Sequence, residues 1–271
     1  MSRLRDIDAV SPGMVTVLGL GLALLFLPLL VIIALSFNAS PYGTLPFQAT
    51  LHWYGTLFAR SGLLGPTWLS LKLSALVAAS AALLGTMGAV WLVRRAGRLG
   101  AVLFRGTLLA AITVPWLILG LAMLLVMNAI GLGRSLFSIY LGLLAISLPY
   151  VVFIVATRLQ AIDPDLEHAA RSLGAGALAT FALVTAPLIL PAILSGTLIA
   201  FVMAFNNFLI QYFLAPFGTQ TLPLKIYTLI RVGYLPDLNA LATLIVATTC
   251  LLILLLHRLG LRNAGLPGST P

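Results

Sequence analysis

The sequence predicts an all-α polytopic membrane protein with six transmembrane helices, and three observations support this. Of the 271 residues, 61% are hydrophobic and only 8% are charged, which is not a soluble globular composition. Four long runs contain no Asp, Glu, Lys or Arg, namely 9–59, 106–133, 172–224 and 238–257. A bilayer-spanning helix needs about 20 apolar residues, and the basic residues bracket these runs as topology signals do.

Each predicted span follows from one apolar run and its ends. The first, 14–37, is longer than the roughly 7–15 residues of a secretory signal core, so we expect it to be retained. Trp53 and Tyr54 in the following loop are typical of an interfacial helix. The remaining five spans are expected at 66–93, 102–128, 135–157, 188–214 and 238–256. Two of them carry small residues at four-residue spacing, which favours close helix packing: Ala81, Gly85, Ala89 and Gly196, Ala200, Ala204.

The basic residues predict the orientation of the chain. With six spans, both termini lie on one side, and that side carries ten of the fifteen lysines and arginines: Arg3, Arg5, Arg94, Arg95, Arg98, Arg105, Arg158, Arg171, Arg258 and Arg262. The opposite side carries the other five: Arg60, Lys72, Arg134, Lys225 and Arg231. Cytoplasmic loops are rich in Lys and Arg, so both termini are expected in the cytoplasm.

A polar segment at 158–187 interrupts the apolar runs and contains a predicted short helix. Asp163 can cap it, Pro164 suits its first position, and Gly174 stands where a C-terminal stop is expected. One face carries an apolar stripe at i, i+3, i+4 and i+7: Leu166, Ala169, Ala170 and Leu173. A helix of about ten residues is marginal in water, so we expect this one to dock on another surface. A connector lying on the protein's own membrane domain is the alternative.

The same segment resembles the EAA loop of ABC-importer permeases, whose pattern is E-A-A, three residues, G, nine residues, then I-x-L-P. Four residues match in register: Ala169, Ala170, Gly174 and Pro187. His168 stands where the pattern has Glu, and Glu167, one place earlier, can supply the missing carboxylate. Val184 and Ala186 replace the Ile and Leu of the pattern.

This resemblance implies the fold of a type I ABC importer permease, with residues 1–271 as one transmembrane domain. A five-helix core at 66–257 would include the loop 158–187, and the loop would be the coupling helix that fits a groove on a separate ATPase subunit. We expect the ATPase contacts to come from the polar residues Glu167, His168 and Arg171. Close docking is expected to depend on Ala169, Ala170 and Gly174.

The fifth predicted span carries the densest group of membrane-buried polar side chains, which are costly unless paired or facing water. Asn206, Asn207 and Gln211 lie beside Tyr212, and Asn207 and Gln211 share a helix face at i, i+4. Two interpretations stay open, namely hydrogen bonds between helices and a polar lining of a translocation path. Trp116 in the third span is a weaker candidate for that path.

The C-terminal third resembles the second permease subunit of spermidine/putrescine-type ABC importers, most specifically at LPLKIYTLIRVG (222–233) and NALATL (239–244). In those relatives the stretch that matches 205–208 commonly carries acidic residues, whereas this chain has Asn206 and Asn207. Amides do not compensate the charge of a polyamine. The sequence therefore admits a neutral, zwitterionic or anionic solute as well, such as an opine, an amino-acid derivative or a phosphonate.

Several kinds of chemistry are missing from the sequence. There is no Walker A loop and no catalytic or metal-ligating constellation, so no cofactor is expected on this chain, and ATP and Mg would belong to partner ATPases. The resemblance implies four kinds of partner: a second permease, two ATPase subunits, an extracytoplasmic solute-binding protein and the lipid of a bacterial inner membrane. The basic residues form no nucleic-acid stripe. The rival interpretation is a self-sufficient secondary transporter or channel, and a membrane enzyme is disfavoured.

Overall fold

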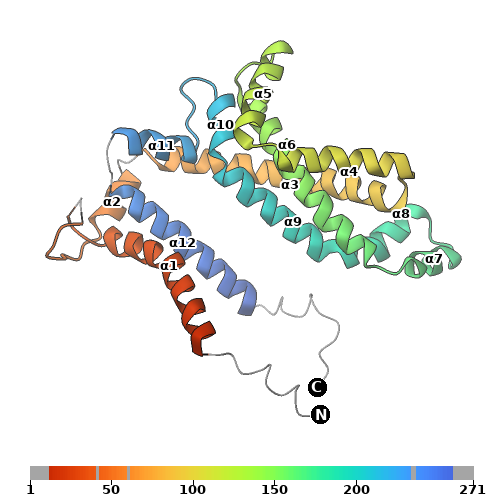
Figure 1. Cartoon of the computed structure of the whole chain (residues 1–271), viewed down its shortest axis with the longest axis horizontal. Coiled ribbons are helices and arrows are strands. Elements are labelled where there is room, and N and C mark those ends of the chain that lie inside the picture. The colour runs from red at the N-terminus through yellow and green to blue at the C-terminus, as the bar shows by residue number, and fades with distance from the viewer. Residues whose placement is uncertain (1–11, 41–42, 60–61, 233–235, 259–271) are drawn as a thin grey trace. The chain divides into compact units, whose positions relative to one another are not determined.

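The computed structural model describes residues 12–40, 43–59, 62–232 and 236–258, and these residues form helices joined by short loops (Figure 1). The all-α prediction is confirmed, since the only extended pairing among them is an isolated bridge between Asn38 and Ala49. The helices are α1 (Pro12–Ser36), α2 (His52–Ala59), α3 (Leu64–Arg94), α4 (Arg98–Thr113), α5 (Trp116–Ala129), α6 (Leu136–Gln160), α7 (Pro164–Ser172), α8 (Ala177–Thr180), a π-helical turn (Phe181–Thr185), α9 (Ala186–Asn206), α10 (Phe208–Leu214), α11 (Leu222–Val232) and α12 (Asp237–Arg258).

Two compact units make up the chain. The first holds α1, α2 and α12, and α12 packs against both of the others. Within this unit a helix, α2, is present at the position where the sequence predicts one around Trp53 and Tyr54. The Trp53 indole N–H donates to the backbone oxygen of Asn38 at 2.7 Å, and the Thr56 hydroxyl donates to the Asp237 carboxylate. These bonds fix α2 between the end of α1 and the start of α12.

The second unit runs from α3 through most of α11, with α6 at its centre. Close packing on α6 depends on the two predicted faces of small residues. A Cβ added to Gly85 of α3 would lie 2.7 Å from Cγ1 of Val151, and one added to Gly196 of α9 would lie 3.2 Å from the same atom. Both small-residue faces are thereby confirmed as packing surfaces.

Four helices are long and apolar enough to cross a membrane: 13–36, 64–94, 136–160 and 177–206. The pair α4 and α5 makes a fifth if it is counted as one bent span. Within the described residues the apolar stretch at the start of α12, Asp237–Thr248, is shorter than a span. The sixth predicted span at 238–256 falls in this helix.

The third predicted span is not one continuous helix, because α4 and α5 meet at an angle of 110°. Pro115 caps α5 and has no N–H for the preceding turn. Val114 is extended, with φ −67° and ψ 128°, as the residue before a proline prefers. The span predicted at 102–128 is thus divided into two helices at Pro115.

The fifth predicted span is displaced and divided. Its helix begins near Ala177, passes through the π-helical turn and ends at Asn206. Asn207 is extended, with φ −74° and ψ 109°, and α10 begins after it. The sequence predicted that Asn207 and Gln211 share one face of a continuous helix. The break at Asn207 shows that they do not. The Asn207 side chain caps α10 where the backbone hydrogen bonds of a continuous helix would otherwise run.

Candidate functional site

The predicted helix in the polar segment is α7, and both of its ends are set by local chemistry. At its start, the Asp163 carboxylate accepts a hydrogen bond from the Asp165 N–H at 3.0 Å, and Pro164 occupies the first turn. At its end, Gly174 has φ +91°, a conformation that favours glycine. The Gly174 and Ala175 N–H groups donate to carbonyls of the last turn at 2.9 and 3.1 Å. This is a Schellman cap, and it confirms the predicted stop.

Glu167 points from α7 into the protein and is only 9% exposed. Its Oε1 accepts from Arg94 at the end of α3, with Nη2 at 3.2 Å and Nε at 3.3 Å. The same oxygen accepts from the hydroxyl of Thr185 at 2.9 Å, and Thr185 is itself buried. One carboxylate thus joins α7 to the ends of two long helices, α3 and the helix that leads into α9.

Thr185 closes the π-helical turn that precedes α9. Pro187 lies just after this turn and has no N–H, so the carbonyl of Leu183, four residues earlier, lacks its α-helical donor. Single π-helical turns within α-helices frequently occur at functional sites. The position of Pro187 in the EAA pattern thus coincides with a widened turn that carries a partner of Glu167.

The outer face of α7 carries the predicted apolar stripe. Leu173 is 90% exposed and Leu166 is 49% exposed, while Ala169 is exposed and Ala170 half-buried. His168 and Arg171 are also exposed, but they lie on the side of α7 that carries Glu167. The His168 Nδ1 lies 3.7 Å from the Asp165 Oδ1 in a solvent-exposed pair. Leu166 and Leu173 of the stripe are therefore available to a surface outside this chain.

A cavity of about 490 Å³ lies beside α7, on the side of the helix that carries Glu167. Its lining joins the last turns of α3 to α7 and to the segment from α8 through the π-helical turn. Basic and apolar side chains share this lining: Arg94, Arg95, His168, Arg171, Leu178 and Phe181.

The predicted amide group lies at the break between α9 and α10. The Asn207 Oδ1 accepts from the Ile210 N–H at 2.8 Å, and the Gln211 Nε2 donates to the Ala204 carbonyl at 3.0 Å. Both side chains are 1% exposed. Within the described part of the chain the Asn207 Nδ2 and the Gln211 Oε1 have no hydrogen-bond partner. The two amides therefore support the helix break from inside the protein.

Asn206 and Tyr212 are the exposed members of this group, and Tyr212 is 47% exposed. Tyr212 belongs to an aromatic cluster with Phe208 and Tyr227, in which ring centroids are 4.8 to 6.0 Å apart. Trp116 opens α5, which packs against α10, and is 37% exposed. The structure thus separates the predicted path residues into an exposed set and a buried set.

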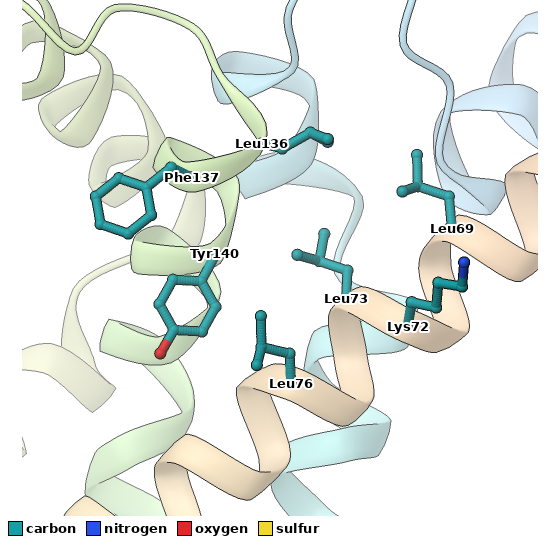
Figure 2. A pocket seen from close by; sticks show the side chains of 7 residues that line it. All are labelled: Leu69, Lys72, Leu73, Leu76, Leu136, Phe137 and Tyr140. Atoms are coloured by element: carbon teal, nitrogen blue, oxygen red, sulfur yellow. The ribbon is translucent and has the colours of Figure 1, made fainter.

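Figure 2 shows a second cavity, of about 540 Å³, between residues 69–76 of α3 and the first turns of α6. Leu73 and Leu76 of α3 lie opposite Phe137 and Tyr140 of α6 across it. Lys72 extends away from Tyr140, and its Nζ lies 5.1 Å from the ring centroid of Trp68. The described lining of this cavity is almost wholly apolar and contains no carboxylate that could bind a cation.

Sequence reasoning missed Arg94 and Thr185 as partners of Glu167, and Tyr227 as a member of the aromatic cluster. The Arg94–Arg95 pair was interpreted only as a topology signal. Tyr227 lies inside the stretch LPLKIYTLIRVG, whose resemblance to polyamine permeases was the available signal.

Comparisons with known proteins agree with this architecture. The family model described as "Binding-protein-dependent transport system inner membrane component" matches residues 81–260. The putrescine transport system permease protein PotI of Escherichia coli (strain K12) is 36% identical over 241 residues, covering 87% of this chain and 86% of PotI. The spermidine/putrescine transport system permease protein PotC of the same strain is 29% identical over 232 residues, covering 86% and 88%.

A crystal structure of a bacterial ABC transporter involved in the import of the acidic polysaccharide alginate has the same fold. It aligns with a TM-score of 0.67 at 18% identity, covering 97% of this chain and 98% of that one. Together with the family match and the similarity to PotI, this leads to one conclusion. The chain belongs to the binding-protein-dependent transport system inner membrane components and is a permease subunit of an ABC importer.

Proposed function

We propose that this permease crosses the membrane six times with both termini in the cytoplasm. It would form a translocation path with a second permease, driven by two ATPase subunits and supplied by an extracytoplasmic solute-binding protein. The excess of arginines on the side of the termini supports this orientation. In the same orientation the loop 158–187 and α7 lie in the cytoplasm, where an ATPase can reach them.

The coupling function of α7 rests on one observation: its leucines face outward while its buried carboxylate is bonded inward. The exposed stripe around Leu166 and Leu173 provides a surface for a groove on the ATPase. His168 and Arg171 lie on the Glu167 side of the helix, in the cavity lining, and are not part of this surface. Glu167 holds the opposite face of α7 to Arg94 and Thr185. We therefore assign Glu167 to transmission within the permease rather than to ATPase contact, which revises its predicted role.

This arrangement gives a physical route for the motion. When the ATPases close, displacement of α7 would pull on α3 through Arg94 and on α9 through Thr185. Both helices pack on α6 through closely fitted small residues, so they would move as rigid bodies. Gly174 supports the docking surface by ending α7 in a left-handed turn.

The coupling proposal is tested by replacing Leu173 with Asp. Leu173 is 90% exposed, so this change removes an apolar contact without disturbing the core, and co-purification of the ATPase and solute uptake should both fall severalfold. Leu99→Asp is the matched control, since Leu99 is 72% exposed on α4 and lies outside the stripe. Normal ATPase co-purification with Leu173→Asp would contradict the docking role of α7.

For the substrate path, we assign Asn206, Tyr212 and Trp116 to the lining and keep Asn207 and Gln211 as supports of the helix break. The solute class follows from two considerations. The names of PotI and PotC favour a polyamine. The aromatic cluster around Tyr212 supplies ring faces for an ammonium group, although the path amides carry no charge. Competition by putrescine against a neutral or anionic solute, measured in the assembled importer, would decide between these classes.

A further inference from the structure

We propose that the cavity beside α7 binds the phosphate group of an anionic phospholipid. Its basic lining comes from two parts of the chain, with Arg94 and Arg95 at the end of α3 and His168 and Arg171 on α7. Among the described residues that line it, Glu167 is the single carboxylate. The cavity volume of about 490 Å³ is large enough for a headgroup.

The positive charge of this cavity is not neutralised from within. Glu167 is occupied by Arg94 and Thr185, whereas Arg95 and Arg171 are exposed and form no ion pair with any carboxylate of the described residues. Two guanidinium groups on separate elements thus face one space without an anion. Guanidinium groups are well suited to phosphate because their N–H groups match its oxygens bidentately.

The apolar part of the lining locates the cavity at a membrane boundary. Val90 lies in the last turns of the apolar helix 64–94, and Ala177 and Leu178 lie in the first turn of the apolar helix 177–206. Leu178 is 81% exposed and Leu183, further along the same segment, is 76% exposed. The charged cavity thus has an exposed leucine in its own lining, and a second exposed leucine lies further along the same segment, where two spans end.

A phospholipid matches both halves of this site, since its phosphate would lie between Arg95 and Arg171 and its acyl chains along the leucines. A free phosphate would use only the arginines, and an acidic side chain of a partner protein would leave the leucines uncovered. Basic pockets at the cytoplasmic ends of transmembrane helices are known to hold anionic headgroups. Bound lipid would link α3 to α7 beside the Glu167 contact.

The test measures lipid retention by the assembled importer, so it does not depend on which solute is carried. The complex is reconstituted in nanodiscs of phosphatidylcholine alone, or of equal parts phosphatidylcholine and phosphatidylglycerol, and retained lipids are counted by native mass spectrometry. Wild type should retain phosphatidylglycerol in preference to phosphatidylcholine. The double variant Arg95→Gln/Arg171→Gln should bind it about tenfold or more weakly.

Two variants serve as controls. Arg95→Lys/Arg171→Lys keeps the charge and should restore most of the retention, while Arg105→Gln removes an exposed arginine outside the cavity and should change nothing. Equal retention by wild type and the double glutamine variant would overturn the proposal. So would displacement by soluble glycerol phosphate at the same concentration as lipid, which would indicate a free phosphate site. Loss of the ATPase subunits with unchanged lipid retention would instead assign the arginines to a protein contact.

Discussion

The two polar centres of the second unit, around Glu167 and around Asn207, use different chemistry. At the coupling loop, a charged side chain is buried and paired, with Arg94 and Thr185 bonded to one carboxylate oxygen. At the break between α9 and α10, two neutral amides are buried more deeply, and each leaves one polar atom without a hydrogen-bond partner among the described residues.

This difference indicates how each centre contributes to transport. An ion pair resists separation and transmits force between the elements it joins, which suits a link between α7 and two long helices. A neutral amide can cap a broken helix inside a membrane at a lower desolvation cost than a carboxylate. We infer that the charged centre around Glu167 transmits motion from α7, and that the amides around Asn207 stabilise the break between α9 and α10.

The largest effect is expected from Glu167→Ala, which removes the ion pair. Arg94 and Thr185 would be left without their partner in a mostly buried site, at a cost of about 3 kcal/mol in the free energy of unfolding. Solute uptake should fall more than ATPase co-purification, because the outer face of α7 is unchanged. Thermal denaturation of the detergent-solubilised complex measures the loss of stability. Uptake into vesicles and ATPase co-purification measure the other two effects.

Glu167→Gln refines this test, since it keeps an acceptor for Thr185 but loses the charge. It should give an intermediate loss of stability and uptake, and combining it with Arg94→Gln should cost less than the sum of the two single changes. Additive effects in this double-mutant cycle would contradict direct coupling between the two side chains.

A somewhat smaller effect is expected from Asn207→Asp. The carboxylate can still accept from the Ile210 N–H, but a charge would be placed where the side chain is 1% exposed, costing about 2 kcal/mol. Asn206→Asp, one position earlier and exposed, should change stability by less than about 0.5 kcal/mol. Thermal denaturation of both variants checks this contrast.

The same pair of variants tests the substrate path. If Asn206 lines it, Asn206→Asp should shift the preference of the importer toward cationic solutes, because a carboxylate compensates an ammonium charge. An unchanged ratio of putrescine uptake to that of a neutral competitor would remove Asn206 from the path.

A third, weaker effect concerns the end of α7. Gly174 has φ +91° with open space around it, so a side chain there is limited by backbone strain and not by a clash. Gly174→Val should therefore destabilise the turn by about 1 to 2 kcal/mol, whereas Gly174→Asn should cost less, since Asn tolerates this conformation. Limited proteolysis of the loop 158–187 would detect the difference. Equal cleavage of the two variants would show that the left-handed turn is not limiting.

The sequence was sufficient for α7 because the signals that define it are local. Asp163, Pro164 and Gly174 are adjacent to the turns they control, and the predicted and observed ends agree. The helix breaks at Pro115 and Asn207 were missed because a membrane span tolerates proline and polar residues in either a continuous or a divided helix. The packing of neighbouring helices decides whether the helix is continuous or divided, and a local sequence pattern does not predict that packing.

The inward direction of Glu167 was missed for a related reason. Its partner Arg94 lies 73 residues earlier in the sequence, and Arg94 also fits the cytoplasmic charge pattern. Nothing within the loop distinguishes Glu167 from Asp165 as the buried carboxylate. Only the packing of α7 on the end of α3 determines which of the two acids is enclosed.

The smallest effect is expected from Asp165→Asn, which tests this distinction on a single helix. Asp165 and Glu167 are two residues apart, and each lies near a basic side chain. The Asp165–His168 pair spans 3.7 Å, with side chains 87% and 69% exposed, so water screens it and its loss should cost at most about 0.5 kcal/mol. Thermal denaturation and uptake should both stay near wild type. A loss of stability and uptake comparable to that of Glu167→Ala would mean that coupling depends on the negative charge of the first turn of α7 and not on the buried link to α3 and α9.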